Sequence, residues 1–148
     1  MHGWRRLTWQ QLFSVEVPES WTAREEDGQV ALFDPARGWG ALHISCARRA
    51  ADDDDDEAEL AFALAADHAA ARDWQVDEKD IGLRTIGSWP AAELAVCDGG
   101  TFWHVWHVVS RRRVAYLSYN CSAPDRTAEA TARARIAASF RWLDSLEN

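Results

Sequence analysis

The chain has 148 residues, of which 47% are hydrophobic and 27% charged; this fits one globular domain spanning 1–148 and excludes disordered and fibrous classes. Its longest apolar run, residues 60–66, is too short to span a membrane, and the first twenty residues lack a signal-peptide core, so we expect a cytoplasmic protein. The net charge of −8 comes from seven acidic residues within 52–59, because the other 17 acidic residues nearly balance 16 basic ones. This balance argues against a nucleic-acid binder.

Four short strands are predicted in the first third of the chain, because each stretch is bounded by turn-forming residues. Asp27-Gly28 is a typical turn between the second and third, which we expect to form a hairpin. In the fourth, Leu42, Ile44 and Cys46 alternate with polar residues and share one face. The predicted strands cover residues 12–17, 21–24, 30–33 and 40–47.

Two helices are predicted from the spacing of apolar residues. Residues 57–72 are rich in Ala and Leu and contain neither Gly nor Pro, and the acidic residues at their start suit the positive end of a helix dipole. Residues 125–140 carry apolar side chains at every fourth position, and Ser122 with Asp125 resembles a capping box. Each helix therefore has an apolar stripe that can pack on a sheet.

The second half of the chain predicts four more strands. Asp98-Gly99-Gly100 is a strong hairpin turn between the second and third of these. The order is strands, a helix, several antiparallel strands and a final helix, which predicts an α+β fold with an antiparallel sheet flanked by helices. These strands cover residues 81–86, 91–97, 101–110 and 114–121.

The strand 101–110 is apolar on both faces, which predicts a central strand that is covered on both sides. We expect a helix to cover one face, and either the other helix or a bound partner to cover the second. Strand alternation separates its side chains into one set of Phe102, His104, Trp106 and Val108 and another of Trp103, Val105, His107 and Val109.

The histidines and cysteines do not predict a metal site or a cofactor. His104 and His107 are three residues apart on a strand and so point to opposite faces, which separates them as metal ligands. Cys46, Cys97 and Cys121 have irregular spacing, and we interpret them as reduced structural thiols.

Two charged runs are interpreted as surface features. The acidic run 52–56 enters the first helix without a Gly, unlike a calcium loop, so we expect a solvated segment that also caps the helix. The basic run 111–113 lies at a predicted hairpin tip and is interpreted as a solvated turn.

Nine tryptophans are an unusually large number for this length. Most are expected in the core, but six lie near the ends of the chain or predicted turns: Trp4, Trp9, Trp21, Trp39, Trp74 and Trp89. Some of these six should be partly exposed, which favours a docking surface for a protein or an apolar ligand.

Short motifs follow one another along nearly the whole chain: residues 13–21, 28–33, 41–45, 87–95, 116–119, 122–125 and 136–141. The first is a strand followed by Pro18, an acidic residue and Trp21, and the last closes the final helix. Together they resemble the PsbP/Mog-like superfamily. The resemblance implies an α/β/α sandwich without shared catalytic residues.

Members of that superfamily include photosystem accessory proteins, a Ran-binding nuclear import factor, bacterial lipoproteins and Eag-type chaperones of type VI secretion effectors. The resemblance therefore implies a binder, and the missing signal and lipobox favour a cytoplasmic bacterial type.

The first functional hypothesis is a non-enzymatic protein-binding module: a small cytoplasmic chaperone, adaptor or toxin-neutralising partner. Its partner would be another protein, such as a secreted effector or toxin, with a homodimer as a further expectation and no nucleic acid or membrane involved. The alternative is a small-molecule-binding protein or enzyme that uses a His in a pocket on the same sheet. In the first hypothesis an aromatic face of the sheet contacts the partner, and the candidate residues are Trp103, Trp106, His104, His107, Tyr116 and Tyr119.

Overall fold

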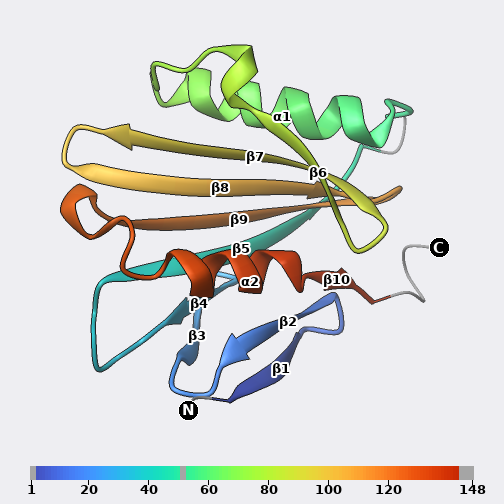
Figure 1. The fold of residues 1–148 in the computed structure, drawn as a ribbon. Coiled ribbons are helices and arrows are strands. Elements are labelled where there is room, and N and C mark those ends of the chain that lie inside the picture. The colour runs from blue at the N-terminus through green and yellow to red at the C-terminus, as the bar shows by residue number, and fades with distance from the viewer. Residues whose placement is uncertain (1–2, 51–52, 144–148) are drawn as a thin grey trace.

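The computed structural model describes residues 3–50 and 53–143, which form an α+β fold built on a large antiparallel sheet (Figure 1). The sheet has seven strands in the order β3-β4-β5-β9-β8-β7-β6, so β8 is an interior strand, as its apolar faces predict. The strands are β3 Thr22–Glu26, β4 Gln29–Phe33, β5 Gly40–Arg48, β6 Gly82–Ile86, β7 Trp89–Asp98, β8 Thr101–Val109 and β9 Arg113–Ser122.

A second sheet of three strands lies below the large one in Figure 1. It consists of β1 (Trp4–Trp9), β2 (Phe13–Pro18) and β10 (Arg141–Trp142), with β2 in the middle. The sequence predicts β2 but not β1 or β10. Strand β1 contains the adjacent arginines Arg5 and Arg6 and has no buried residue, so only its pairing with β2 identifies it as a strand.

Helix α1 (Glu57–Ala71) confirms the first predicted helix almost to the residue. Helix α2 (Ala130–Ala138) is shorter than the predicted 125–140. The Ser122 hydroxyl donates to Asp125 Oδ2 at 2.8 Å, but this pair lies at a separate 3-10 turn, η2 (Ala123–Asp125). The predicted capping residues therefore do meet, one turn ahead of α2. A second 3-10 turn, η1 (Glu78–Asp80), precedes β6.

The two faces of the large sheet carry separate cores. One face packs against α1 through the alanines at 61, 65 and 69, together with Leu94 and Val105. The other packs against α2 and the small sheet, and it buries Leu42, Ile44 and Leu117. Figure 1 shows α1 on one side of the sheet and α2 with β1 and β2 on the other. Both faces of β8 are therefore covered by the chain itself.

The expectation that some of the six tryptophans are partly exposed is confirmed. Trp39 has an exposed fraction of 38%, and Trp4, Trp9 and Trp89 are half-buried. Trp21 and Trp74 are buried, because each packs into one of the two cores. Trp39 is thus the tryptophan best placed for contact with another molecule.

No helix in the described ranges has the length and apolar character needed to cross a membrane.

Candidate functional site

The six candidate partner-binding residues do not form one surface. His107 pairs with Tyr116 across β8 and β9, and these two share the α1 face with Trp103. His104 pairs with Tyr119 and shares the opposite face with Trp106. The prediction of a single aromatic sheet face is therefore wrong, because strand alternation divides the six residues three and three.

Burial corrects the same prediction further. Trp106, His107 and Tyr119 are buried, so the chain itself already covers the side chains that a partner would have to touch. Trp103, His104 and Tyr116 are half-buried.

On the α1 face, the three residues meet side chains from α1 and from the segment after it. Tyr116 Oη and His68 Nε2 are 2.7 Å apart, and the His107 ring lies 4.8 Å from the Tyr116 ring. Trp74 lies edge-on to His68 and close to Trp103. The arrangement is an aromatic core beneath the helix, which we call the α1 cluster: His68, Trp74, Trp103, His107 and Tyr116.

Burial keeps the histidines of the α1 cluster neutral. It lowers the pKa of His107 to about 4, with a smaller contribution from His68, and it lowers the pKa of His68 together with the nearby charge of Arg72. His107 Nδ1 is buried and has no hydrogen-bond partner within the described residues. A neutral imidazole tolerates this position better than a charged one.

On the opposite face, His104 is held at both ring nitrogens. Arg133 Nε lies 3.0 Å from Nδ1, and Glu93 Oε2 lies 2.6 Å from Nε2. Because a guanidinium can only donate, Nδ1 is the acceptor, and Nε2 donates its hydrogen to the carboxylate. The hydrogen bond from His104 lowers the pKa of Glu93, and Arg84 Nε adds a 3.0 Å contact to Glu93 Oε1.

Arg133 also connects this network to a buried carboxylate. Its guanidinium lies over the rings of Phe102 and Tyr119 at 4.9 Å each, and the Tyr119 hydroxyl donates to Glu129 Oε1 at 2.7 Å. Burial raises the pKa of Glu129. Gly40 is needed beside this pair, because an added Cβ would lie 2.6 Å from the Tyr119 hydroxyl. The network fastens α2 to the sheet.

Several hollows lie on the surface near these residues. One of about 650 Å³ is lined by His104 and Glu93 and by residues near the start of β6. Two others, of about 430 and 410 Å³, lie on either side of Trp39. Of the six sequence candidates, His104 lines the 650 Å³ hollow, and Trp106 lines a smaller one of about 250 Å³.

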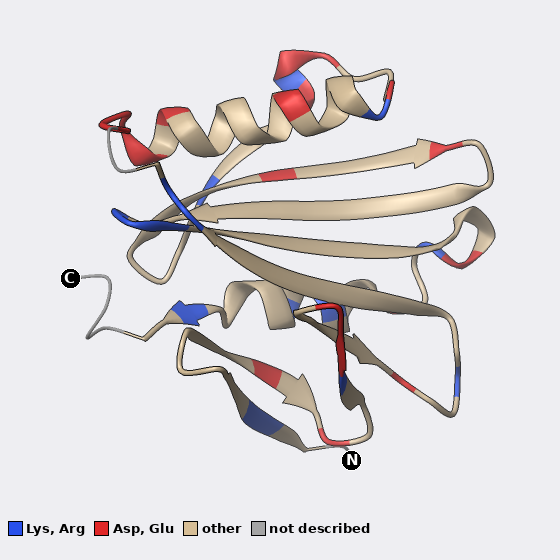
Figure 2. Ribbon diagram, turned by 180° about the vertical axis from the view of Figure 1, so that it is seen from behind, with Lys and Arg blue, Asp and Glu red and all other residues tan. Residues whose placement is uncertain are grey.

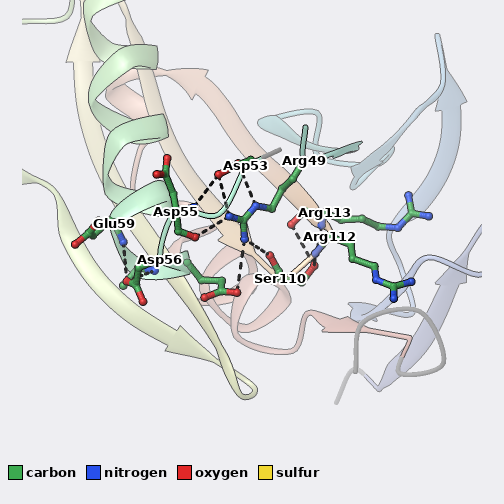
Figure 3. Close-up of polar contacts among 10 residues, drawn as sticks. Arg49, Asp53, Asp55, Asp56, Glu59, Ser110, Arg112 and Arg113 are labelled. Atoms are coloured by element: carbon green, nitrogen blue, oxygen red, sulfur yellow. Dashed lines mark hydrogen bonds and ion pairs between the residues drawn. The ribbon is translucent and has the colours of Figure 1, made fainter. Parts of the chain in front are cut away.

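The acidic run before α1 is anchored as well as solvated (Figure 3). Arg49, whose side chain is 4% exposed, donates to both Asp53 carboxylate oxygens and to the carbonyl oxygens of Asp55 and Ser110. The hydrogen bond from Arg49 lowers the pKa of Asp53. Asp56 caps α1 as predicted, because its carboxylate accepts the amides of residues 58 and 59. Asp52 lies outside the described residues.

The basic run 111–113 lies at the β8–β9 turn, as predicted. Figure 2 shows it in blue close to the red start of α1. The Ser110 hydroxyl accepts the amides of Arg112 and Arg113, and the Arg49 amide donates to the Arg112 carbonyl oxygen. This contact joins the turn to the acidic segment, so the two charged runs support each other's position.

Sequence reasoning missed Glu93 and Arg133 as partners of His104. The Asp98-Gly99-Gly100 turn contained a signal for the first, because a two-residue turn between Asp98 and Thr101 places Ala95 opposite His104. Glu93 is then its diagonal neighbour. Arg133 has no comparable signal, since α2 packs on the sheet from a distant part of the sequence.

Within the described residues, no group of three or more His, Cys, Asp and Glu side chains is arranged to hold a metal ion.

Comparison with known proteins shows the fold. The chain matches no protein-family profile and no curated protein sequence. Among solved structures it is similar to a protein from Bacteroides thetaiotaomicron, with a TM-score of 0.69 and 18% identity over 99% of this chain. The chain spans about half the length of that protein, 51%.

Two further structures are similar. Cyanobacterial PsbP (CyanoP) from Synechocystis sp. has a TM-score of 0.66 and 10% identity, with 96% of this chain and 94% of that chain covered. LpqN, described as involved in cell envelope biogenesis of Mycobacterium tuberculosis, has a TM-score of 0.57 and 15% identity, with 88% and 82% covered. At these identities the likeness concerns architecture alone: the chain has a PsbP-like fold.

Proposed function

We propose that this protein is a non-catalytic protein-binding module, a small cytoplasmic chaperone, adaptor or toxin-neutralising partner, whose contact surface is centred on Trp39. One observation carries the proposal: Trp39 is exposed and lines two hollows. Large aromatic side chains beside hollows are typical anchors of protein interfaces. The proposed contact surface therefore lies around the segment before β5, and not on strand β8 as the sequence predicted.

The walls of the two hollows support a protein ligand. The 430 Å³ hollow includes Trp4 and Trp21 with the carboxylates of Asp34 and Glu129, and the 410 Å³ hollow includes Phe33. Aromatic walls beside a few charged groups suit an apolar side chain flanked by polar ones.

The PsbP-like fold supports the finer parts of the proposal by analogy alone. These finer parts are membership of the wider PsbP/Mog-like superfamily, an α/β/α layering with α1 and α2 on opposite sides of the sheet, and a relationship to Eag-type effector chaperones.

The alternative, an enzyme or small-molecule binder using a histidine, has one supporting observation. His104 meets the Glu93 carboxylate beside the 650 Å³ hollow. A general base needs a free nitrogen that can accept the substrate's proton. His104 uses Nδ1 to accept from Arg133 and Nε2 to donate to Glu93, so this geometry favours a structural histidine.

The proposal is tested by affinity capture from cells of the source organism with wild-type protein, Trp39→Ala and Leu83→Ala. Leu83 is a matched control, because it and Trp39 are the two exposed large hydrophobic side chains among the described residues. We expect a protein partner that Leu83→Ala retains and Trp39→Ala loses. Equal capture by the two variants, or a ligand that proves to be a small molecule, would contradict the proposal.

A further inference from the structure

One edge of the large sheet is incomplete. Strand β6 pairs with β7 only from Ile86 opposite Trp89 to Gly82 opposite Glu93, whereas β7 continues to Asp98. Past Glu93, β7 has β8 on one side and no paired strand on the other among the described residues. Residues 94–98 therefore form a free edge, which we call the β7 edge.

The turns on either side of β7 identify which backbone groups point outward. Ile86 and Trp89 close one two-residue turn, and Asp98 and Thr101 close the other. Each turn begins with a glycine at positive φ, as in type II′ turns, whose closing residues are hydrogen-bonded to each other.

Backbone groups of successive strand residues point alternately to the two neighbouring strands, so counting in steps of two from a turn shows which residues face outward. The two turns identify the same residues. From Trp89, the residues facing β6 are Ala91, Glu93 and then Ala95 and Cys97. From Asp98, the residues bonded to β8 are Val96 and Leu94. The amides and carbonyls of Ala95 and Cys97 thus point away from the sheet, and their side chains are exposed.

The opposite edge of the same sheet shows how a protected edge looks. Strand β3 ends in Arg24, Glu25 and Glu26, and charged side chains discourage pairing with another chain. Residues 94–97 are Leu, Ala, Val and Cys, with neither a charge nor a proline. Within the β7 edge the one charged residue is Asp98, at its end, so the rest of the edge lacks the usual protection.

The 650 Å³ hollow runs along the β7 edge. Ala95, Val96 and Cys97 line one side of it, and residues of the 75–80 segment line another. The edge is therefore recessed, which admits a single extended peptide. A second copy of this chain presents the same recessed edge, so two such edges do not approach each other as a symmetric dimer requires.

The charges of the hollow favour an acidic peptide. Asp80 already accepts the Asp77 amide at 2.8 Å, and Glu93 is engaged by Arg84 and His104. Lys79 lines the same hollow. Its ammonium lies 3.9 Å from Asp77 Oδ2, but the Lys79 side chain is 82% exposed, and a solvated pair of this kind is weak. A carboxylate on the incoming peptide can therefore compete with Asp77 for this cation.

We propose that an extended, acidic segment of a partner protein binds the β7 edge as an added strand that pairs with Ala95 and Cys97 in line with β6. Backbone hydrogen bonds supply the affinity in this mode of recognition, and side chains tune it. The inference rests on the proposed protein-binding function but uses a surface other than that around Trp39.

The test is an NMR titration of the ¹⁵N-labelled protein with the peptide acetyl-Val-Glu-Val-Thr-Val-amide. We expect the amide signals of Ala95 and Cys97 to shift and their hydrogen exchange to slow at least about tenfold at roughly millimolar peptide. Two peptides are matched controls: one with alternate amides N-methylated, which removes donors, and one with Lys in place of Glu. The first should not bind, and the second should bind at least about threefold more weakly.

Three results would overturn the inference: no shift at Ala95 and Cys97, equal binding of the methylated peptide, or a free protein that is already dimeric with both amides protected. Ala95→Pro provides a second route, since proline is tolerated where the amide faces away from the sheet. The Ala95→Pro variant should no longer bind the peptide. The N-methylated peptide tests the role of the backbone hydrogen bonds without altering the protein.

The two proposals fail separately. If Ala95→Pro retains the captured cellular partner and Trp39→Ala loses it, the β7 edge inference is wrong and the proposed function stands. If both variants lose that partner, both surfaces contribute.

Discussion

His104 and His107 lie three residues apart on β8, yet the two faces of the sheet give them opposite surroundings. His107 lies in the aromatic α1 cluster with a pKa of about 4 and an unpartnered Nδ1 among the described residues. His104 lies in a charged network between Glu93 and Arg133, with both nitrogens bonded. One face is closed by neutral aromatic packing and the other by hydrogen bonds between charged groups.

The difference shows that aromatic and histidine-rich strands need not be binding surfaces. Each face of β8 is completed by its own chain, and what remains open is at the margins: the hollows beside Trp39 and the β7 edge. The two faces should also respond differently to substitution and to pH.

The largest effect is expected on the charged face. Arg133→Ala removes donors to His104 Nδ1 and to the Arg126 carbonyl oxygen, at 3.0 and 2.8 Å, and leaves two part-buried acceptors without these partners. We expect the free energy of unfolding to fall by about 3 kcal/mol. Urea denaturation measures this change.

Arg135→Ala is the control, because this neighbouring arginine is exposed and pairs with Glu16 at the surface. It should cost less than about 1 kcal/mol. Equal losses of unfolding free energy in the two variants would show that the network around His104 does not stabilise this face of the sheet.

Acid should destabilise the folded protein through the histidines of the α1 cluster. The unfolded chain protonates His107 near its ordinary pKa of 6.5, while the folded chain resists protonation down to about 4, so stability is full above the unfolded value and falls as the pH drops below it. Between about pH 7.5 and about pH 5, His107 alone should cost about 2 kcal/mol. His68, whose pKa is also lowered, acts in the same direction.

Urea denaturation at a series of pH values checks this expectation, with His107→Phe as the comparison. In the variant, the free energy of unfolding should depend less steeply on pH in that window. The window lies above the range where Glu93 is protonated. An identical slope in the two proteins would contradict the buried, neutral state of His107.

A smaller effect is expected where α1 joins the sheet. Arg49→Ala removes the guanidinium that ties Asp53 and Asp55 to the Ser110 carbonyl oxygen, and we expect a loss of about 1.5 kcal/mol. Arg48→Ala is the control, since Arg48 is exposed and opposite Arg113, and it should change little. Thermal unfolding of the two variants separates the anchoring role of Arg49 from a general effect of lost positive charge.

The smallest effect concerns the helix cap. Asp56→Ala removes the acceptor for the amides of residues 58 and 59 and should cost about 1 kcal/mol, measured by the same thermal unfolding. Asp54→Ala removes an exposed charge two residues earlier and should be neutral or slightly stabilising. If Asp54→Ala were as harmful as Asp56→Ala, the acidic run would act through its total charge.

Much of the fold follows from local sequence. Helix α1, the turns at Asp27-Gly28 and Gly99-Gly100, and the two-sided character of β8 are local patterns, and the structure confirms them. Strands β1 and β10 and the late start of α2 are not local, because β1 and β10 are defined by pairing with β2 and α2 by packing on the sheet.

The candidate site was harder to predict. Alternation correctly separated His104 from His107, but the six candidates were drawn from both faces, and burial could not be read from residue type alone. The exposure of Trp39 depends on how segments distant in sequence pack around it, because its two hollows are lined by residues from 4 to 132. The β7 edge depends on β6 being shorter than β7, and a sequence does not show where a strand loses its neighbour.

Hydrogen exchange of residues 94–97 in the free protein tests most directly whether binding capacity lies at the margins of a closed sheet. Leu94 and Val96 should be protected at least about a hundredfold more strongly than Ala95 and Cys97, because only the first pair is bonded to β8. Uniform protection of all four amides would mean that the edge is already occupied, and it would contradict this account.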